Sequence, residues 1–368
     1  MGRWRPVEVM VRPVWDGRRV LITGDTGFKG SWLSLWLADL GALVAGFALP
    51  AATDPSLFES ARIGDLVEHT DGDIRDLDAV ERVVQQTAPE VVFHLAAQPL
   101  VRYSYQAPIE TYATNVMGTA HVLDACRRQS SVKAIIVVTT DKCYENREWV
   151  WPYRESDPLG GHDPYSSSKG AAELVASAYR RSYFGVDGAP LLATVRAGNV
   201  IGGGDWSTDR LIPDFVRAFE RGERVRIRSP RAVRPWQHVL EALDGYLTIA
   251  ARLLKGDRAV ATAWNFGPDQ EDARSVSWIA TRMVELFGAG GWDQDEAPQA
   301  HEATMLMLDC SKARQELGWR PAWPVAKALE RVVAWHRGAA DGGDARALTL
   351  NQIKEYQALG RALAGEYL

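Results

Sequence analysis

The sequence has 368 residues, of which 46% are hydrophobic and 24% are charged. These values are typical of a globular protein and exclude disordered, collagenous and coiled-coil chains. The net charge of −5 argues against a dedicated nucleic-acid binder, which would usually be basic. No run of about 18 apolar residues predicts a membrane span. We therefore expect neither a nucleic acid nor a membrane as partner, and the length predicts roughly two domains.

The three cysteines, Cys126, Cys143 and Cys310, are far apart and odd in number. They form no disulfide framework and no zinc spacing, which favours a reducing compartment, the cytoplasm, and predicts no metal site. The first 17 residues have no apolar run long enough for a signal peptide. We expect them to be an extension before the first strand.

In chain order, short apolar runs alternate with helical patterns. The predicted strands are residues 19–23, 43–49, 91–95, 134–139, 191–195 and 263–266. The predicted helices are residues 32–40, closed by Gly41, and residues 77–87, 109–128 and 167–183. The strands are continuously apolar, as in a parallel sheet that helices cover on both faces. The order therefore predicts a doubly wound α/β fold.

Gly24, Gly27 and Gly30 lie between the first strand and the first helix. Glycines there permit positive φ and a close approach of the backbone to a pyrophosphate at the helix N-terminus. The G-x-x-G-x-x-G spacing differs from the usual G-x-G-x-x-G dinucleotide fingerprint, and three glycines can also form a plain tight turn. Their position in the first βα turn favours dinucleotide binding.

The second predicted strand lacks the acidic residue that usually holds the ribose hydroxyls of NAD. It ends in Leu49 and Pro50, and Asp54 comes a little late. No arginine is present there to bind a 2′-phosphate, so the residues leave both NAD and NADP open. On the next loop Asp73 and Ile74 are candidates for a contact with adenine, with a simple turn as the alternative.

Tyr165 and Lys169 lie four residues apart and share one face of a predicted helix. A lysine cation beside a phenol lowers the phenol's pKa from about 10 toward the working pH, which makes it a usable base. Alone, such a pair is usually a solvated helix face. Thr140, however, follows an apolar strand, and ligands bind at the carboxyl ends of strands in open α/β sheets.

Several segments together resemble the extended short-chain dehydrogenase/reductase family, and within it the CDP-glucose 4,6-dehydratases. The resemblance runs from about Arg18 to the C-terminal region. Its segments are residues 24–32, 94–97, 114–116, 139–144, 165–169, 198–206, 234–238 and 264–268. It implies a Rossmann-type fold with a smaller C-terminal substrate-binding domain. The implied division places residues 18–196 and 234–266 in the NAD-binding domain, and residues 197–233 and 267–368 in the substrate domain.

The resemblance also implies a tightly bound NAD that is recycled in each turnover. The residues implied to bind it are Gly24, Thr26, Gly27, Phe28, Lys29, Gly30, Asp73, Ile74, Leu95, Ala96, Ala97, Gln98, Asn115, Tyr165 and Lys169. The residues implied to bind a sugar nucleotide are Ser104, Asn199, Arg210, Leu211, Arg234 and His238. For His238 a packed, hydrogen-bonded histidine is the simpler interpretation.

Dehydratases of this family oxidise C4 of a nucleotide-bound hexose, eliminate water across C5–C6 and return the hydride to C6. By resemblance, Tyr165 takes the O4 proton, Lys169 holds the nicotinamide ribose and Thr140 positions O4. Asp141 aligns with the acid that protonates the departing C6 oxygen, a task for which a carboxyl with a raised pKa is suitable.

Lys142 stands where the dTDP-glucose branch has a glutamate base. A neutral Lys142 could remove the C5 proton if its pKa is depressed, and a charged one could stabilise a developing enolate. A surface ion pair with Asp141 or Glu145 is the structural alternative.

Six arginines lie close together in an acidic chain, at positions 221, 224, 226, 228, 231 and 234. Such a local cluster favours a small anion, and a diphosphate needs one or two bidentate arginines. Arg234, with Arg210, matches the family's phosphate positions, and we expect most of the others to be solvated or structural.

CDP-glucose is the expected substrate, with another NDP-hexose, a 4-epimerase reaction or a non-catalytic dinucleotide-binding regulator as alternatives. Asp141 favours dehydration, because an epimerase has no leaving hydroxyl to protonate. The family also implies a homodimer, possible as part of a tetramer, through the helices expected at residues 109–128 and 167–183.

Overall fold

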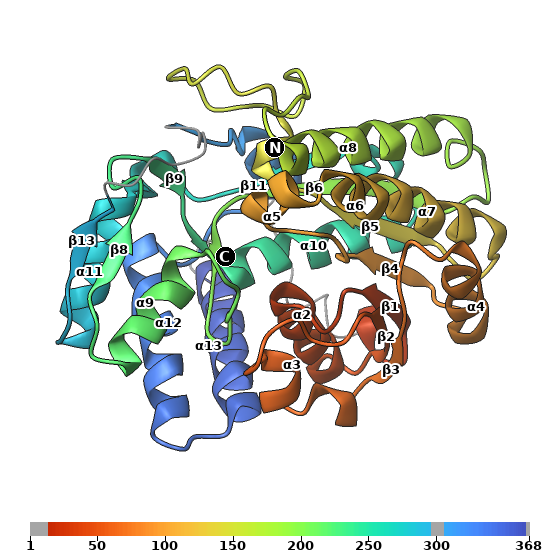
Figure 1. Ribbon diagram of the computed structural model, residues 1–368. Helices are drawn as coiled ribbons and strands as arrows, with labels where there is room; N and C mark the ends of the chain where they lie inside the picture. Colours follow the sequence, from red (N-terminus) through yellow and green to blue (C-terminus); the bar gives the residue numbers. More distant parts are fainter. Residues whose placement is uncertain (1–13, 296–304, 366–368) are drawn as a thin grey trace.

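The centre of the protein is a seven-stranded parallel sheet, seen in a computed structural model that describes residues 14–295 and 305–365 (Figure 1). Its order is β11-β6-β5-β4-β1-β2-β3. The strands are β1 (Arg19–Thr23), β2 (Leu43–Ala48), β3 (Glu68–Asp71), β4 (Val91–His94), β5 (Ala134–Val138), β6 (Leu191–Ala197) and β11 (Ala263–Phe266). Every neighbouring pair is parallel, which confirms the predicted doubly wound α/β fold.

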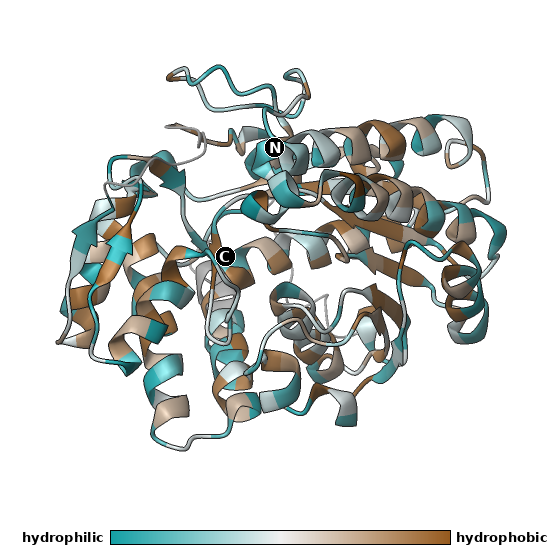
Figure 2. Cartoon of the chain, viewed as in Figure 1, coloured by the Kyte–Doolittle hydropathy of each residue, from teal (hydrophilic) through white to brown (hydrophobic). Residues whose placement is uncertain are grey.

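Helices cover both faces of this sheet. The helices are α2 (Phe28–Asp39), α3 (Leu57–Ser60), α4 (Leu77–Thr87), α5 (Val101–Gln106), α6 (Pro108–Tyr112), α7 (Gly118–Arg128), α8 (Pro164–Ser182), α9 (Leu211–Glu220), α10 (Val239–Leu254), α11 (Val276–Phe287), α12 (Val325–Ala340) and α13 (Ala345–Gly365). Leu21 points into the apolar cluster of α4, α7 and α8, and the next residue, Ile22, into that of α2 and α10. Both faces are buried, and the central strands of the sheet carry the hydrophobic colour in Figure 2.

Within the main sheet and the helices predicted around it, two differences from the sequence prediction stand out. The edge strand β3 was not predicted, because its residues Glu-His-Thr-Asp include no apolar side chain and only one neighbour pairs with it. The helix expected at residues 109–128 is divided, since a π-helical turn (Ala113–Met117) separates α6 from α7. π-Turns inside helices are frequent near functional sites.

Apart from the core on the two faces of the sheet, a second apolar cluster lies beside it and joins α9, α11 and α12 through residues such as Phe215, Ile279 and Leu329. Two short two-stranded sheets flank it, β8 (Val225–Ile227) with β13 (Trp292–Gln294) and β9 (Val233–Pro235) with β12 (Ala273–Ser275). A third pair joins β7 (Val200–Ile201) to β10 (Gln237–His238). The long C-terminal helix α13 returns to the main body, where Tyr356 packs edge-on against Trp36 of α2. The exact division into domains stays a prediction.

All three cysteines are buried free thiols. Within residues 14–295 and 305–365, none of the helices has the length and apolar character needed to cross a membrane.

Candidate functional site

A cavity of about 1000 Å³ lies at the carboxyl ends of the strands and extends to the second cluster. Most of the predicted site residues line it. Those at the cavity wall are Gly24, Thr26, Gly27, Phe28, Lys29, Gly30, Asp73, Ile74, Leu95, Ala96, Ala97, Gln98, Thr140, Asp141, Lys142, Tyr165, Lys169, Asn199, Arg210, Leu211 and Arg234. This edge of an open parallel sheet is where ligands bind.

The glycine turn is shaped by close backbone contacts. Gly24 has φ of +81°, and a Cβ there would lie 2.6 Å from the Ala96 nitrogen. A Cβ on Gly30 would lie 2.1 Å from the Gly24 carbonyl oxygen. Gly27 caps α2 without any side-chain hydrogen bond, so the first amides of the helix face the cavity without a side-chain acceptor. This arrangement fits a pyrophosphate.

Asp25, inside the same turn, was not among the predicted site residues. Its carboxylate is fully buried, and Oδ2 lies 2.7 Å from His69 Nδ1 on β3. Gly46 of β2 makes space for this carboxylate, because a Cβ at position 46 would lie 1.9 Å from Asp25 Oδ2. Burial raises the pKa of Asp25, and the neighbouring His69 opposes the rise. The pair ties the turn to β2 and β3.

The cavity wall at the end of β2 consists of small and apolar residues around Leu49 and Pro50, without an acid. On the neighbouring loop, Asp73 is bound twice by Arg75, through its backbone amide at 2.8 Å and its guanidinium at 2.6 Å. Arg75 also lies 3.5 Å from Glu110. The arginine at this end of the cavity is therefore already paired with two carboxylates.

Tyr165 and Lys169 lie on the first turns of α8 and are almost completely buried. Burial raises the pKa of Tyr165 to about 12, and a hydrogen bond with Thr140 works against it. Burial also lowers the pKa of Lys169 to about 8, and its ammonium donates to the Val138 carbonyl at 3.2 Å. The expected lowering of the phenol's pKa by the lysine is thus not present in this state, because desolvation is the larger effect.

Asp141 begins the short 3₁₀ turn after β5 and is 1% exposed. Its Oδ1 accepts a hydrogen bond from Thr140 at 3.0 Å, whereas Oδ2 has no hydrogen-bond partner among the described residues. Gly198 allows this position, since a Cβ there would lie 1.8 Å from Oδ2. Asp141 is a residue of the cavity wall, and its buried oxygen without a partner is suited to a ligand's hydroxyl.

Lys142 is half-buried at the cavity wall. In the part of the chain that the structure describes, its ammonium forms no ion pair with Asp141 or Glu145. The surface ion pair that the sequence allowed as an alternative role of Lys142 is therefore not observed.

Lys29 reaches toward the same charged groups from the other side. Burial lowers the pKa of Lys29 to about 7, and the cations Arg210 and Lys169 lower it further, against Asp141 and Asp205. Within the described ranges its ammonium makes no hydrogen bond. The sequence presented Lys29 only as part of the glycine turn.

The side of the cavity formed by the second cluster is rich in arginine. Arg210 Nη1 lies 3.2 Å from Asp205 Oδ2, and Arg234 is buried with 6% exposure. Arg226 and Arg228 also line the cavity, which the sequence did not distinguish from their neighbours. The other three members of the cluster, Arg221, Arg224 and Arg231, do not line it.

Three predicted site residues are not at the cavity wall. Ser104 is fully buried and accepts a hydrogen bond from the Tyr165 amide at 3.1 Å. Asn115 holds the Gln98 backbone, accepting from its amide at 2.8 Å. His238 is fully buried between Trp32 and Trp323 and caps α10 by accepting from the Leu240 amide. The three residues do not line the cavity in this structure, so their direct contact with a ligand stays a prediction, and for His238 the packed alternative agrees with its position.

The comparisons with known proteins agree with this geometry. A family model described as GDP-mannose 4,6 dehydratase matches residues 21–332. A CDP-glucose 4,6-dehydratase of Salmonella typhimurium is 53% identical over 351 residues, which cover 93% of this chain and 97% of that protein.

Two solved structures share the fold. An epimerase of Methanothermobacter thermautotrophicus has a TM-score of 0.79 at 23% identity, covering 91% of this chain and 96% of its own. A dTDP-glucose 4,6-dehydratase of Streptomyces venezuelae, solved with NAD bound, has a TM-score of 0.75 at 24% identity, covering 89% and 99%.

Proposed function

The chain belongs to the GDP-mannose 4,6-dehydratase family, and we propose that it converts CDP-glucose to CDP-4-dehydro-6-deoxyglucose and water. The observation that carries the choice of substrate is the 53% identity to a CDP-glucose 4,6-dehydratase along nearly the whole chain. The site supports it with an acid, Asp141, beside the Tyr165–Lys169 pair. Another NDP-hexose as substrate is the nearest alternative.

The cofactor we propose is NAD. The glycine turn and the uncapped N-terminus of α2 fit its pyrophosphate, and Asp73 and Ile74 fit the adenosine end. NADP is disfavoured, because Arg75 is already paired with Asp73 and Glu110 and no arginine or lysine lies between residues 48 and 56. When bound, NAD supplies the acceptor for the C4 hydride and the donor that returns it to C6.

The residues of the chain move the protons. Tyr165 takes the O4 proton while Thr140, which is hydrogen-bonded to it, positions O4. Lys169 holds the nicotinamide ribose. Asp141 gives a proton to the departing C6 hydroxyl, which leaves as water as the C5 proton is removed. Its buried Oδ2, which has no hydrogen-bond partner among the described residues, supports this assignment.

Lys142 acts at C5. A neutral amine removes the C5 proton, whereas a charged one stabilises the enolate that forms when another group removes it. Both roles require a Lys142 side chain without a competing ion pair, and the absence of one to Asp141 or Glu145 among the described residues supports them.

We also propose a cytoplasmic homodimer, with a tetramer of two such dimers as the alternative. The helices α6 to α8 expose apolar side chains that a second copy would cover: Ile109 is 81% exposed, Met117 52% and Leu174 60%.

The decisive experiment is incubation with CDP-glucose, without added cofactor, followed by NMR of the sugar. We expect the 4-keto-6-deoxy product, and none from a Tyr165→Phe variant that still binds NAD. Inversion at C4 would instead establish a 4-epimerase, and no turnover of any NDP-hexose would support a dinucleotide-binding regulator. A Tyr165→Phe variant with a near wild-type rate would contradict the assignment of the base.

A further inference from the structure

A buried carboxylate lies one helical turn beyond the catalytic lysine. Tyr165, Lys169 and Glu173 follow one another at intervals of four residues on α8, so they form one stripe on the helix face toward the sheet. Glu173 is 3% exposed and does not line the cavity. The reaction outlined above gives it no role, although a buried charge is costly unless it is well bound.

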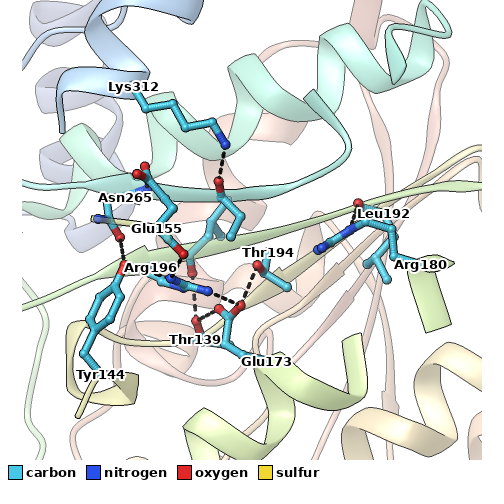
Figure 3. Close-up of polar contacts among 12 residues, drawn as sticks. Thr139, Tyr144, Glu155, Glu173, Arg180, Leu192, Thr194, Arg196, Asn265 and Lys312 are labelled. Atoms are coloured by element: carbon cyan, nitrogen blue, oxygen red, sulfur yellow. Dashed lines mark hydrogen bonds and ion pairs between the residues drawn. The ribbon is translucent and has the colours of Figure 1, made fainter. Parts of the chain in front are cut away.

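The Glu173 carboxylate binds both strands that end beneath the site (Figure 3). Its Oε1 accepts from the Thr139 hydroxyl at 2.5 Å. Its Oε2 accepts from the Thr194 hydroxyl at 2.8 Å and from Arg196 Nη2 at 2.7 Å. Thr139 immediately precedes Thr140, so the carboxylate connects the helix that carries Tyr165 to the segment that carries the proposed acid.

Lys169 is attached one residue earlier on the same strand end, through its bond to the Val138 carbonyl. The ammonium and the carboxylate on successive turns of α8 therefore bind successive residues, Val138 and Thr139. Together they link α8, which carries Tyr165, to the strand end that precedes Thr140.

Arg196 extends this network to the other side of the site. Its Nη1 donates to the Tyr144 hydroxyl at 2.8 Å, and that hydroxyl donates to Asn265 of β11 at 2.6 Å (Figure 3). Tyr144 lies two residues after Lys142. The ion pair of Glu173 with Arg196 is thus connected to both ends of the 139–144 segment.

The groups that face the Lys169 ammonium come from four elements: Glu173 of α8, Cys143 after β5, His94 of β4 and Lys29 of α2. Burial raises the pKa of Cys143 and lowers the pKa of His94 to about 3, so both are neutral near pH 8. Lys29 can only repel the ammonium. Of these four groups, Glu173 opposes the effect of burial on the pKa of Lys169 most strongly, ahead of Cys143.

We propose that Glu173 is a positioning residue for the dehydration: its carboxylate keeps Lys169 charged and holds α8 at the correct distance from the Thr139–Thr140 strand end. The proposal rests on the proposed function for its kinetic test but not for its spectroscopic one.

The test compares Glu173→Gln with the wild type. The neutral amide removes the anion, and an opposite charge beside an ionisable group typically shifts its pKa by about 1–3 units. In the pH profile of kcat, we expect the alkaline limb to move to lower pH by about one unit or more. The pKa of Lys169, followed by NMR of ¹³C-lysine-labelled protein and assigned with Lys169→Arg, should fall by a similar amount. An unchanged limb and an unchanged Lys169 titration, with only a lower Tm, would overturn the proposal.

Two controls separate charge from packing. Glu155→Gln removes a nearby half-buried carboxylate that binds the Asn265 amide and does not face Lys169. Thr194→Val removes one hydrogen bond of Glu173 and keeps its charge. Neither should move the Lys169 titration, and a shift as large as that of Glu173→Gln in either would count against the proposal.

Glu173→Asp keeps the charge with a shorter reach and tests the proposal if Glu173→Gln does not fold. We expect an unmoved alkaline limb and a kcat about tenfold to a hundredfold lower, because the spacing of α8 changes. Wild-type kcat would overturn the spacing role. If the wild-type protein turned over no sugar nucleotide, the proposed function would fail, while the NMR titration would still decide the effect of Glu173 on Lys169.

Discussion

The two sides of the cavity are built from different parts of the chain. The side formed by the glycine turn uses backbone: its shape depends on glycines whose missing Cβ atoms leave space, and on helix amides without a side-chain cap. The opposite side uses long cationic side chains, such as Arg210 and Arg234, carried by short strands and loops. A backbone site tolerates almost no added volume, whereas each arginine can be removed with a graded loss of affinity.

The largest effect is expected from Gly30→Ala. The new methyl group would lie 2.1 Å from the Gly24 carbonyl oxygen, so the turn must open. We expect the free energy of unfolding to fall by about 2 kcal/mol. We also expect NAD to bind about 100-fold more weakly, equivalent to about 2.7 kcal/mol.

Calorimetry of NAD binding and thermal melts would measure both. Gly64→Ala is the matched control, because a Cβ there meets only the Phe58 ring at 3.9 Å. Undiminished NAD affinity in Gly30→Ala would show that the turn does not hold the cofactor.

A smaller effect, limited to the substrate, is expected from Arg210→Gln. A hydrogen bond to a charged group contributes about 1.5–3 kcal/mol, so KM for CDP-glucose should rise about tenfold or more. NAD affinity should not change, since Arg210 lies on the opposite side of the cavity. Equal losses for both ligands would contradict the division into two sides.

The Lys29 side chain lies between the two sides of the cavity, because it extends from the glycine turn toward Arg210. Its pKa of about 7 means that it is charged below pH 7 and neutral above it. The affinity for CDP-glucose, whose diphosphate does not titrate in this range, should therefore weaken as pH rises from 6 to 8. Because the Lys29 charge is partly exposed, we expect this affinity to change by about threefold to fivefold.

Calorimetric titration in a Tyr165→Phe background, which prevents turnover, would measure this slope. Lys29→Met should flatten it, and an identical slope in both proteins would exclude Lys29 from the diphosphate site.

The smallest effect is expected from Arg224→Gln. Arg224 belongs to the same arginine cluster but has a 58% exposed side chain, pairs with Asp293 and does not line the cavity. KM and Tm should equal those of the wild type within error. A raised KM would mean that charge density alone, rather than position, binds the diphosphate.

The sequence predicted the backbone side better than the arginine side. Spacing identifies Gly24, Gly27 and Gly30, because the constraint on each is local. Apart from Arg234, which the family resemblance distinguishes, the arginines of the cluster are equivalent in the sequence, and only the tertiary structure separates Arg226 and Arg228, at the cavity wall, from Arg224.

Burial explains the remaining differences. His238 and Ser104 match positions in the resemblance, yet the packing of neighbouring elements removes them from the wall. The pKa of Tyr165 rises because desolvation outweighs nearby charge, and no spacing rule expresses that balance.

Gly198 has no functional group, and in a sequence alone a change at this position looks like a harmless loop variant. Yet the Asp141 carboxylate occupies the place where a side chain of residue 198 would begin. Even alanine there would push the proposed acid away from the C6 hydroxyl while leaving Asp141 itself intact. A survey of natural variants should therefore treat position 198 as an inactivating site, equivalent to loss of the acid.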